Sequence, residues 1–313
     1  MRSLAVAEVS CYHLAPVKRS CRAVTKRLRG GPRTRAGLDT KRQSQDVGAL
    51  TSGTMAGPWA WVQKKIPTGT QVFDAHAHVG VDIDGRAMTA DGMKERMDAA
   101  NVHTSIIFPL NDPNARDDYS GPNDVVWAAH EEYQEAFVPF FRLNPHKDYE
   151  AEFTRCVERG FKGLKLHPVS QEFELDDARV VRLFEMAAEA DLPVLVHAGF
   201  AMERIVEPLL PTVERLPELR LILGHTAMVE LLAATRAFSD HPNVLFETSV
   251  VRAKDLYVLF CSMEPARICY GSDIPYGDLP STLHASLLAA DVAGLSEKEL
   301  SGVLSGNIRR WFS

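Results

Sequence analysis

The stretch QVFDAHAHVG, residues 71–80, places two histidines two positions apart near the end of an apolar run. Successive side chains of a β-strand point to opposite faces, so His76 and His78 share one face. A buried imidazole needs a hydrogen-bond partner or an ion in place of water. We therefore expect this stretch to be a strand that carries part of a functional site.

Seven further apolar or β-branched runs follow along the chain. With the first, the expected strands are residues 71–79, 103–110, 137–144, 161–167, 193–198, 219–225, 243–250 and 267–273. Eight strands that alternate with helical stretches over about 240 residues predict the α/β class and a parallel (β/α)8 TIM barrel. The alternative is an open doubly wound sheet, but no glycine-rich phosphate loop follows the first strand.

One connecting stretch, residues 176–190, shows the helical pattern clearly. Apolar residues at helical spacing predict one buried face, formed by Val180, Val181, Phe184, Ala187 and Ala188. Two aspartates stand where an N-cap and a first helical turn favour acids, at positions 176 and 177. This stretch is therefore expected to be an amphipathic helix that packs on the sheet.

Composition places the chain among ordinary globular proteins. Its 313 residues are 45% apolar and 24% charged, and no apolar run has the roughly 18 residues that a membrane span needs. The five cysteines form no C-x-x-C pair, which argues against a disulfide framework or a zinc ribbon. We expect a cytoplasmic protein without a membrane partner.

Charge divides the chain into two parts. Residues 1–54 contain 11 Lys and Arg against 3 Asp and Glu, which leaves 24 against 38 for residues 55–313. We expect a basic, mostly disordered arm over 1–54 and a catalytic domain over 55–313. The arm could be an organelle transit peptide, a nucleic-acid-binding segment or, as we favour, an extension upstream of a true start at Met55. The acidic domain argues against nucleic acid as a partner.

Chemically capable side chains gather at the ends of the expected strands. They are His76 and His78, Lys165 and His167, His197, His225, and Asp273. The carboxyl ends of the strands carry the active site in a TIM barrel. Hydrogen-bonded core groups are the structural alternative, but a divalent cation would satisfy clustered imidazoles and a carboxylate together. Such ligands suit Zn²⁺, and also Mn²⁺ or Fe²⁺.

Six motifs occur in a fixed order along the chain: FDAHAHVG, RGFKGLKLHP, PVLVHAG, LILGHTA, YGSDIPYG and SGNIRRWF. With them, residues 71–313 resemble the amidohydrolase superfamily. Within it they resemble the amidohydrolase-2 (amidohydrolase-related) group, which includes enzymes similar to aminocarboxymuconate semialdehyde decarboxylase. The resemblance implies a metal-dependent TIM-barrel enzyme with a small-molecule substrate, and a homodimer.

The resemblance also implies roles for single residues. His76, His78, His197 and Asp273 would bind one divalent metal, with Zn²⁺ the expected ion. Asp273 would in addition move a proton between water and substrate, and His225 would act beside it as an acid, base or electrostatic partner.

Two metals are the alternative. In that case a carboxylated Lys165 would bridge the ions and His225 would join the metal shell, and GLKLH also resembles the corresponding segment of urease. With one metal, Lys165, His167 and Arg142 are expected to bind substrate. Their structural alternatives are an ion pair for Lys165, a backbone hydrogen bond for His167, and an acidic partner inside the barrel for Arg142.

Three functions fit this site. We expect hydrolysis of a C–N or C–O bond in a small molecule by metal-activated water. The alternative is a decarboxylase or hydratase that acts on an unsaturated or aromatic carboxylic acid, for which a cationic side chain must hold the carboxylate. A metal-binding protein without catalysis is the third, and the proton-transfer partners argue against it.

Overall fold

The structure is a computed structural model that describes residues 58–113, 115 and 118–312. The expected arm over 1–54 and its boundary lie outside the described residues, so both stay predictions.

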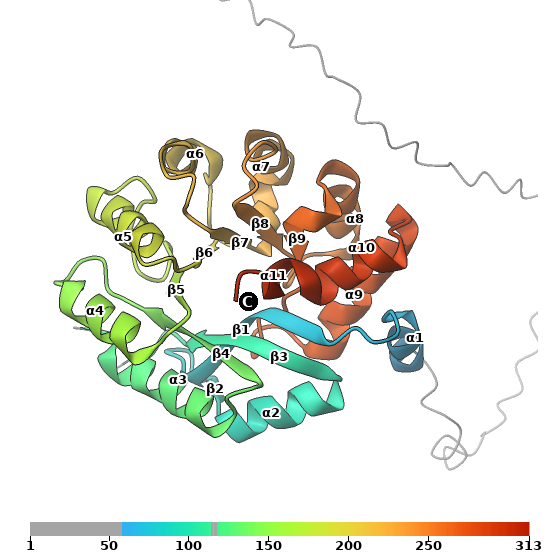
Figure 1. The fold of residues 1–313 in the computed structure, drawn as a ribbon, viewed down its shortest axis with the longest axis horizontal. Helices are drawn as coiled ribbons and strands as arrows, with labels where there is room; N and C mark the ends of the chain where they lie inside the picture. The colour runs from blue at the N-terminus through green and yellow to red at the C-terminus, as the bar shows by residue number, and fades with distance from the viewer. Residues whose placement is uncertain (1–57, 114, 116–117, 313) are drawn as a thin grey trace, which may run out of the picture. The chain divides into compact units, whose positions relative to one another are not determined.

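A single curled sheet forms the centre of the described part, and helices surround it (Figure 1). Its strands are β1 (Val72–Val81), β2 (Ala87–Met88), β3 (Val102–Pro109), β4 (Phe137–Arg142), β5 (Gly163–Leu166), β6 (Val194–His197), β7 (Leu221–Gly224), β8 (Val244–Glu247) and β9 (Ile268–Cys269). Neighbours pair in the order β2-β1-β3-β4-β5-β6-β7-β8-β9, and every pair except β1 with β2 is parallel.

Backbone hydrogen bonds close the sheet into a barrel. The segment after β9 runs beside β1, where Asp273 N donates to His76 O at 2.7 Å and His78 N donates to Ile274 O at 2.9 Å. Eight parallel strands, β1 and β3 to β9, therefore form the predicted (β/α)8 TIM barrel. These bonds also bring the two ends of the barrel sequence, and with them His76 and Asp273, into one place.

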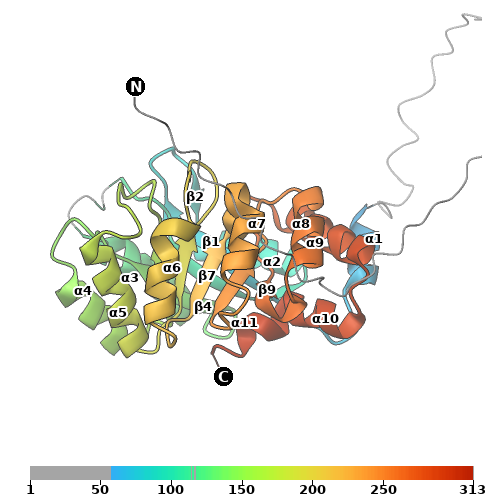
Figure 2. The same cartoon turned by 90° about the horizontal axis from the view of Figure 1, so that it is seen from above.

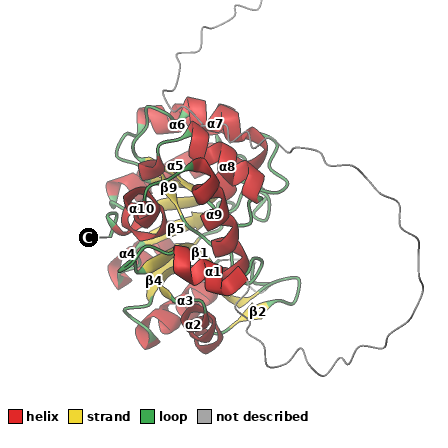
Figure 3. Cartoon of the chain, turned by 90° about the vertical axis from the view of Figure 1, so that its right-hand side faces the viewer, coloured by secondary structure: helices red, strands yellow, loops and turns green. Residues whose placement is uncertain are grey.

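The helices pack on the outside of this barrel, as Figure 3 shows in red around the yellow strands. They are α1 (Pro58–Lys65), α2 (Ala90–Ala99), α3 (Ser120–Glu132), α4 (Glu150–Arg159), α5 (Ala178–Glu189), α6 (Val206–Arg215), α7 (Leu231–Ala237), α8 (Ala253–Ser262), α9 (Leu279–Ala293), α10 (Glu297–Ser301) and α11 (Asn307–Arg309). None of the described helices combines the length and the apolarity that crossing a bilayer requires.

The predicted helix over 176–190 is α5. Asp177 is its N-cap, and its carboxylate accepts a hydrogen bond from Arg179 N at 2.8 Å, as the acidic start indicated. The buried face differs in part from the expectation. Leu183 belongs to it, whereas Val181 and Ala188 are only half-buried, because the contact stripe is narrower than the apolar pattern.

All eight expected strands are present, but most are shorter than predicted. Ladder pairing stops where the chain turns away above the barrel, so His225 begins a 3-10 turn and Asp273 lies four residues beyond β9. β1 is instead longer, and it folds back as an antiparallel hairpin with β2. A two-residue strand such as β2 leaves no periodic signal in the sequence.

The core has two layers that follow the alternation of each strand. Outward residues such as Leu164 and Leu166 pack under the helices, as predicted. Inward strand residues such as Phe140 fill the barrel interior together with Ile308 of α11. At the end of the barrel beside α11 in Figure 2, Phe312 packs on Phe140 with ring centroids 6.1 Å apart. This filled end leaves the carboxyl ends of the strands for the site.

Candidate active site

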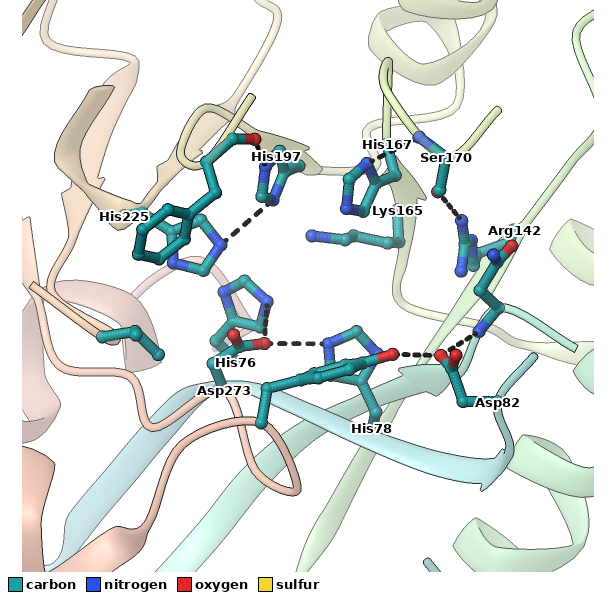
Figure 4. Close-up of a pocket in the computed structure, with 14 residues that line it drawn as sticks. His76, His78, Asp82, Arg142, Lys165, His167, Ser170, His197, His225 and Asp273 are labelled. Carbon is teal, nitrogen blue, oxygen red and sulfur yellow. Dashed lines mark hydrogen bonds and ion pairs between the residues drawn. The ribbon is translucent and has the colours of Figure 1, made fainter. Parts of the chain in front are cut away.

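A cavity of about 340 Å³ opens at the carboxyl ends of the strands (Figure 4). It is lined by His76, His78, Asp82, Asn111, Arg142, Lys165, His167, Ser170, His197, Phe200, His225, Val250, Asp273 and Tyr276. The structure thus places every side chain expected in the site on one cavity.

Three of the expected ligands converge most closely. Asp273 Oδ1 lies 3.1 Å from His76 Nε2 and 3.0 Å from His78 Nε2, and all three side chains are buried. Asp74 joins the two backbone segments that carry this group, because its side chain accepts hydrogen bonds from His76 N at 3.0 Å and from Ser272 N at 2.8 Å. This group of three has a donor set that a divalent metal ion takes.

The carboxylates around this group favour a bound cation. Burial and Lys165 lower the pKa of His76, but Asp273 and Glu247 outweigh them and raise it. The two carboxylates therefore favour a positive charge at His76. Burial would raise the pKa of Asp273, yet His76 and His78 hold it well below its ordinary range. Two imidazoles and an ionised carboxylate fit a divalent cation at this position.

Glu247, at the end of β8, is a site residue that the sequence analysis missed. It is fully buried, and its Oε2 lies 2.8 Å from His76 Nδ1. With His76 and His225 it forms a second group of side chains close enough to share an ion. The strand-end rule that selected Asp273 applies equally to Glu247, so the signal was present in NVLFETSV.

His197 lies apart from the three converging ligands. Its Nδ1 is 3.1 Å from His225 Nε2, and its Nε2 donates to the carbonyl of Phe200 at 3.0 Å. Burial lowers the pKa of His197 to about 2, so the ring is neutral. As a metal ligand through its unprotonated Nδ1, His197 would keep its contact with Phe200 and give up the one with His225.

Two buried cations face the same cavity. Lys165 Nζ has no hydrogen-bond partner among the described residues, and burial lowers the pKa of its amine to about 7. Arg142 donates to Pro109 O at 3.3 Å and to Ser170 Oγ at 3.1 Å, while its Nε has no partner among those residues. In the described part, neither side chain forms an ion pair with a carboxylate.

His167 makes the local contact that its position before Pro168 suggested. Its Nδ1 accepts a hydrogen bond from Ser170 N at 3.2 Å. Its ring also stacks on that of His197, with centroids 3.8 Å apart and an angle of 9° between the planes. Burial lowers the pKa of His167 well below its ordinary value, so it borders the cavity as a neutral ring.

Asp82 and Tyr276 form a second feature that the sequence did not reveal. The hydroxyl of Tyr276 donates to Asp82 Oδ2, which also accepts from Asn111 N at 3.1 Å. The Tyr276 ring meets the His78 ring edge-on, with centroids 5.2 Å apart. These contacts fix the hairpin of β1 and β2 at the mouth of the cavity.

Comparison with known families gives one assignment. Residues 73–313 match the model of the Amidohydro_2 family, which is described as amidohydrolase. Among curated proteins no sequence match was found.

Several solved structures share the fold. A dihydroxybenzoic acid decarboxylase from Polaromonas with bound manganese and the inhibitor 2-nitroresorcinol is 16% identical, with a TM-score of 0.58 over 78% of this chain and 97% of the other. A probable 2-pyrone-4,6-dicarboxylic acid hydrolase from Acinetobacter baumannii is 13% identical, with a TM-score of 0.55 over 77% and 99%. A 4-oxalomesaconate hydratase from Rhodopseudomonas palustris is 14% identical, with a TM-score of 0.56 over 77% and 95%. At these identities the likeness concerns the fold.

Proposed function

The chain belongs to the amidohydrolase family, and from this premise we propose that it is a metal-dependent lyase that decarboxylates or hydrates a small unsaturated or aromatic carboxylic acid. The observation that supports this most is the pair Arg142 and Lys165, two buried cations without a carboxylate partner in the described part of the chain. Structural relatives include a decarboxylase and a hydratase whose names specify carboxylic acids.

Burial of an unpaired charge is costly unless a ligand compensates it. Arg142 and Lys165 are paired in register on neighbouring strands, so the guanidinium and the amine lie side by side on one wall. An anionic ligand would gain charge-assisted hydrogen bonds from both. A substrate carboxylate is the simplest such anion. A neutral amide would leave the buried positive charge uncompensated.

The opposite wall supplies the metal ligands of the proposal. His76, His78 and Asp273 would hold one divalent ion, with His197 as the fourth ligand. Zn²⁺ is the expected ion, although Mn²⁺ or Fe²⁺ suits the same atoms and the decarboxylase from Polaromonas contains manganese. When bound, such an ion supplies a Lewis acid that polarises substrate oxygen atoms. Two ions, with Lys165 and His225 added as ligands, remain the alternative.

Proton transfer falls to Asp273 in this proposal. Its carboxylate is ionised and faces the cavity, so it can take a proton from a hydroxyl group or water and return it to a substrate carbon. His225 lies beside it as a neutral ring, because burial lowers its pKa. His225 would then orient the substrate oxygen by a hydrogen bond, while Arg142 with Ser170 holds the carboxylate.

Hydrolysis is the second candidate function. An ionised Asp273 beside two imidazoles is equally suited to deprotonate water, and one structural relative is named as a hydrolase of a pyrone dicarboxylic acid. A lactone that carries a carboxylate would satisfy Arg142 and Lys165 as well. Product chemistry, rather than the architecture of the cavity, separates the two candidates.

The full chain loaded with Zn²⁺ or Mn²⁺ should be incubated with hydroxybenzoates, unsaturated dicarboxylates, carboxylated lactones and neutral amides. NMR in D₂O would follow carbon deuteration with release of CO₂, water addition, or ring opening. Turnover of acids by either of the first two routes supports the lyase. Ring opening alone would replace it by the hydrolase, and turnover of neutral amides alone would overturn the role of the two cations.

The proposal also includes the partners and the cellular location of the protein. A small-molecule substrate is central to it, whereas a homodimer, a cytoplasmic location and the absence of nucleic-acid or membrane partners remain predictions from the sequence.

A further inference from the structure

Glu247 sits in a site built to hold an ionised carboxylate. Its Oε2 accepts hydrogen bonds from Ser249 Oγ at 2.8 Å and from His225 N at 3.2 Å, and it lies 2.8 Å from His76 Nδ1. Its Oε1 accepts from Ser249 N. A carboxylate has about four acceptor positions, so this one is saturated without any Lys or Arg. The cost of burying its charge is offset by these donors.

The barrel reserves space for this side chain. A Cβ at Gly271 would lie 2.0 Å from Glu247 Oε1, closer than any side chain tolerates. β8 and β9 are paired with Glu247 opposite Cys269, so Gly271 stands two residues beyond that pair. The glycine of the YGSD motif is therefore required for close approach to Glu247, which its sequence context did not explain.

The contact with Glu247 determines how His76 meets the cavity. An ionised carboxylate can only accept a hydrogen bond, so His76 Nδ1 must carry the proton. His76 Nε2 faces the other side, where it lies 3.1 Å from Asp273 Oδ1 and where a metal ion would replace a second proton. A neutral imidazole binds a metal through its unprotonated nitrogen, and a partner on the other nitrogen decides which one that is.

We propose that Glu247 is a positioning residue that orients His76 and keeps its proton on Nδ1, so that Nε2 is presented to the divalent metal. The inference rests on the metal-dependent function proposed above. Glu247 also accepts a hydrogen bond from the main chain of His225, whose φ of 58° is unusual for a residue with a side chain. One carboxylate thus contacts a proposed metal ligand and the main chain of the histidine that would orient the substrate oxygen.

The variant Glu247→Gln tests this with little change of volume. Its NH₂ group either replaces Oε2, so that His76 loses its acceptor, or replaces Oε1, where repulsion from Ser249 N displaces the amide from His76. We expect the zinc dissociation constant of the full chain, measured by competition with a chelator, to rise roughly 10- to 100-fold. Glu152→Gln on α4 is the matched control and should leave it unchanged.

A second readout isolates the role of Glu247 from general loss of structure. In the zinc-loaded chain labelled with ¹⁵N-histidine, NMR should show a protected Nδ1 proton on His76 that is shifted or lost in Glu247→Gln but retained in Glu152→Gln. Circular dichroism confirms that each variant is folded. Gly271→Ala, which displaces Glu247 without changing any charge, should weaken zinc binding in the same direction.

Different results would overturn the proposed function and the role of Glu247. A wild-type chain that binds neither zinc nor manganese would overturn the proposed function and this inference with it. If the wild-type chain binds zinc and the folded variants at positions 247 and 271 bind it equally well, only the role of Glu247 is wrong. A zinc-loaded wild-type chain with the His76 proton on Nε2 would also contradict that role.

Discussion

Arg142 and Lys165 occupy paired positions on the parallel strands β4 and β5, and both extend into the cavity with only 1% of their surface exposed. Neither has an acidic partner among the described residues. Two adjacent buried basic groups without a carboxylate partner destabilise a protein unless they serve a ligand. The pair Arg142 and Lys165 is therefore expected to support substrate binding at a cost in folding stability.

Replacement of Lys165 should therefore stabilise the ligand-free protein. In Lys165→Met the buried charge is removed and the volume is nearly kept, so we expect the free energy of unfolding to be unchanged or to rise by about 1–3 kcal/mol. Urea denaturation measures it, with the exposed Lys162→Met as control. A loss of more than about 2 kcal/mol would mean that Lys165 has a structural role after all.

Replacement of Arg142 should weaken substrate binding. Arg142→Met removes charge-assisted hydrogen bonds worth about 3 kcal/mol, so the KM for a carboxylic acid should rise roughly 100-fold. Inhibition by the uncharged ester of the same acid should change little. Steady-state kinetics with both compounds checks this, and equal losses for acid and ester would show that Arg142 does not bind the carboxylate.

Asn123 on α3 should hold the strand that carries Arg142. Its Oδ1 accepts from Arg142 N at 2.9 Å, and its Nδ2 donates to Arg142 O at 3.0 Å, so one buried amide serves as a partner for the end of β4. Asn123→Ala leaves both backbone groups unpaired and should cost about 2–4 kcal/mol of unfolding free energy. A change below about 0.5 kcal/mol in thermal or urea denaturation would show that water replaces the amide without loss.

Tyr276 should fix the hairpin at the mouth of the cavity. In Tyr276→Phe the ring stays against His78, but Asp82 loses a hydrogen bond that helps to keep its pKa below the ordinary value against the effect of burial. We expect hydrogen exchange at the amides of Asp84 and Asn111, which donate to Asp82, to accelerate roughly fivefold. Unchanged exchange would mean that Asp82 is held by its backbone donors alone.

The barrel could be predicted because its strands obey simple rules. Each inner strand is covered on both faces, so apolar runs reveal the strands, and the carboxyl-end rule then directs attention to residues such as His76, Lys165 and Asp273. The same rule covers Glu247 at the end of β8, so the sequence contains the signal for this residue as well.

Other parts of the site depend on contacts that no local pattern encodes. Asp82 and Tyr276 meet from loops nearly 200 residues apart, and neither loop has a periodic structure. The orientation of His197 toward Phe200 O depends on a rotamer and a neighbouring carbonyl. Such details are decided by tertiary packing, so the sequence predicted which side chains share the cavity but not which atoms face each other.

The central claim is that His76, His78 and Asp273 bind a divalent metal ion. Elemental analysis of the gently purified full chain, supplemented with zinc or manganese, tests it most directly beside the double variant His76→Ala, His78→Ala. We predict one equivalent of metal in the wild-type chain and none in the variant, whereas two equivalents would assign Lys165 and His225 to the metal shell. Absence of bound metal from the wild-type chain, or equal binding by the variant, would contradict the account.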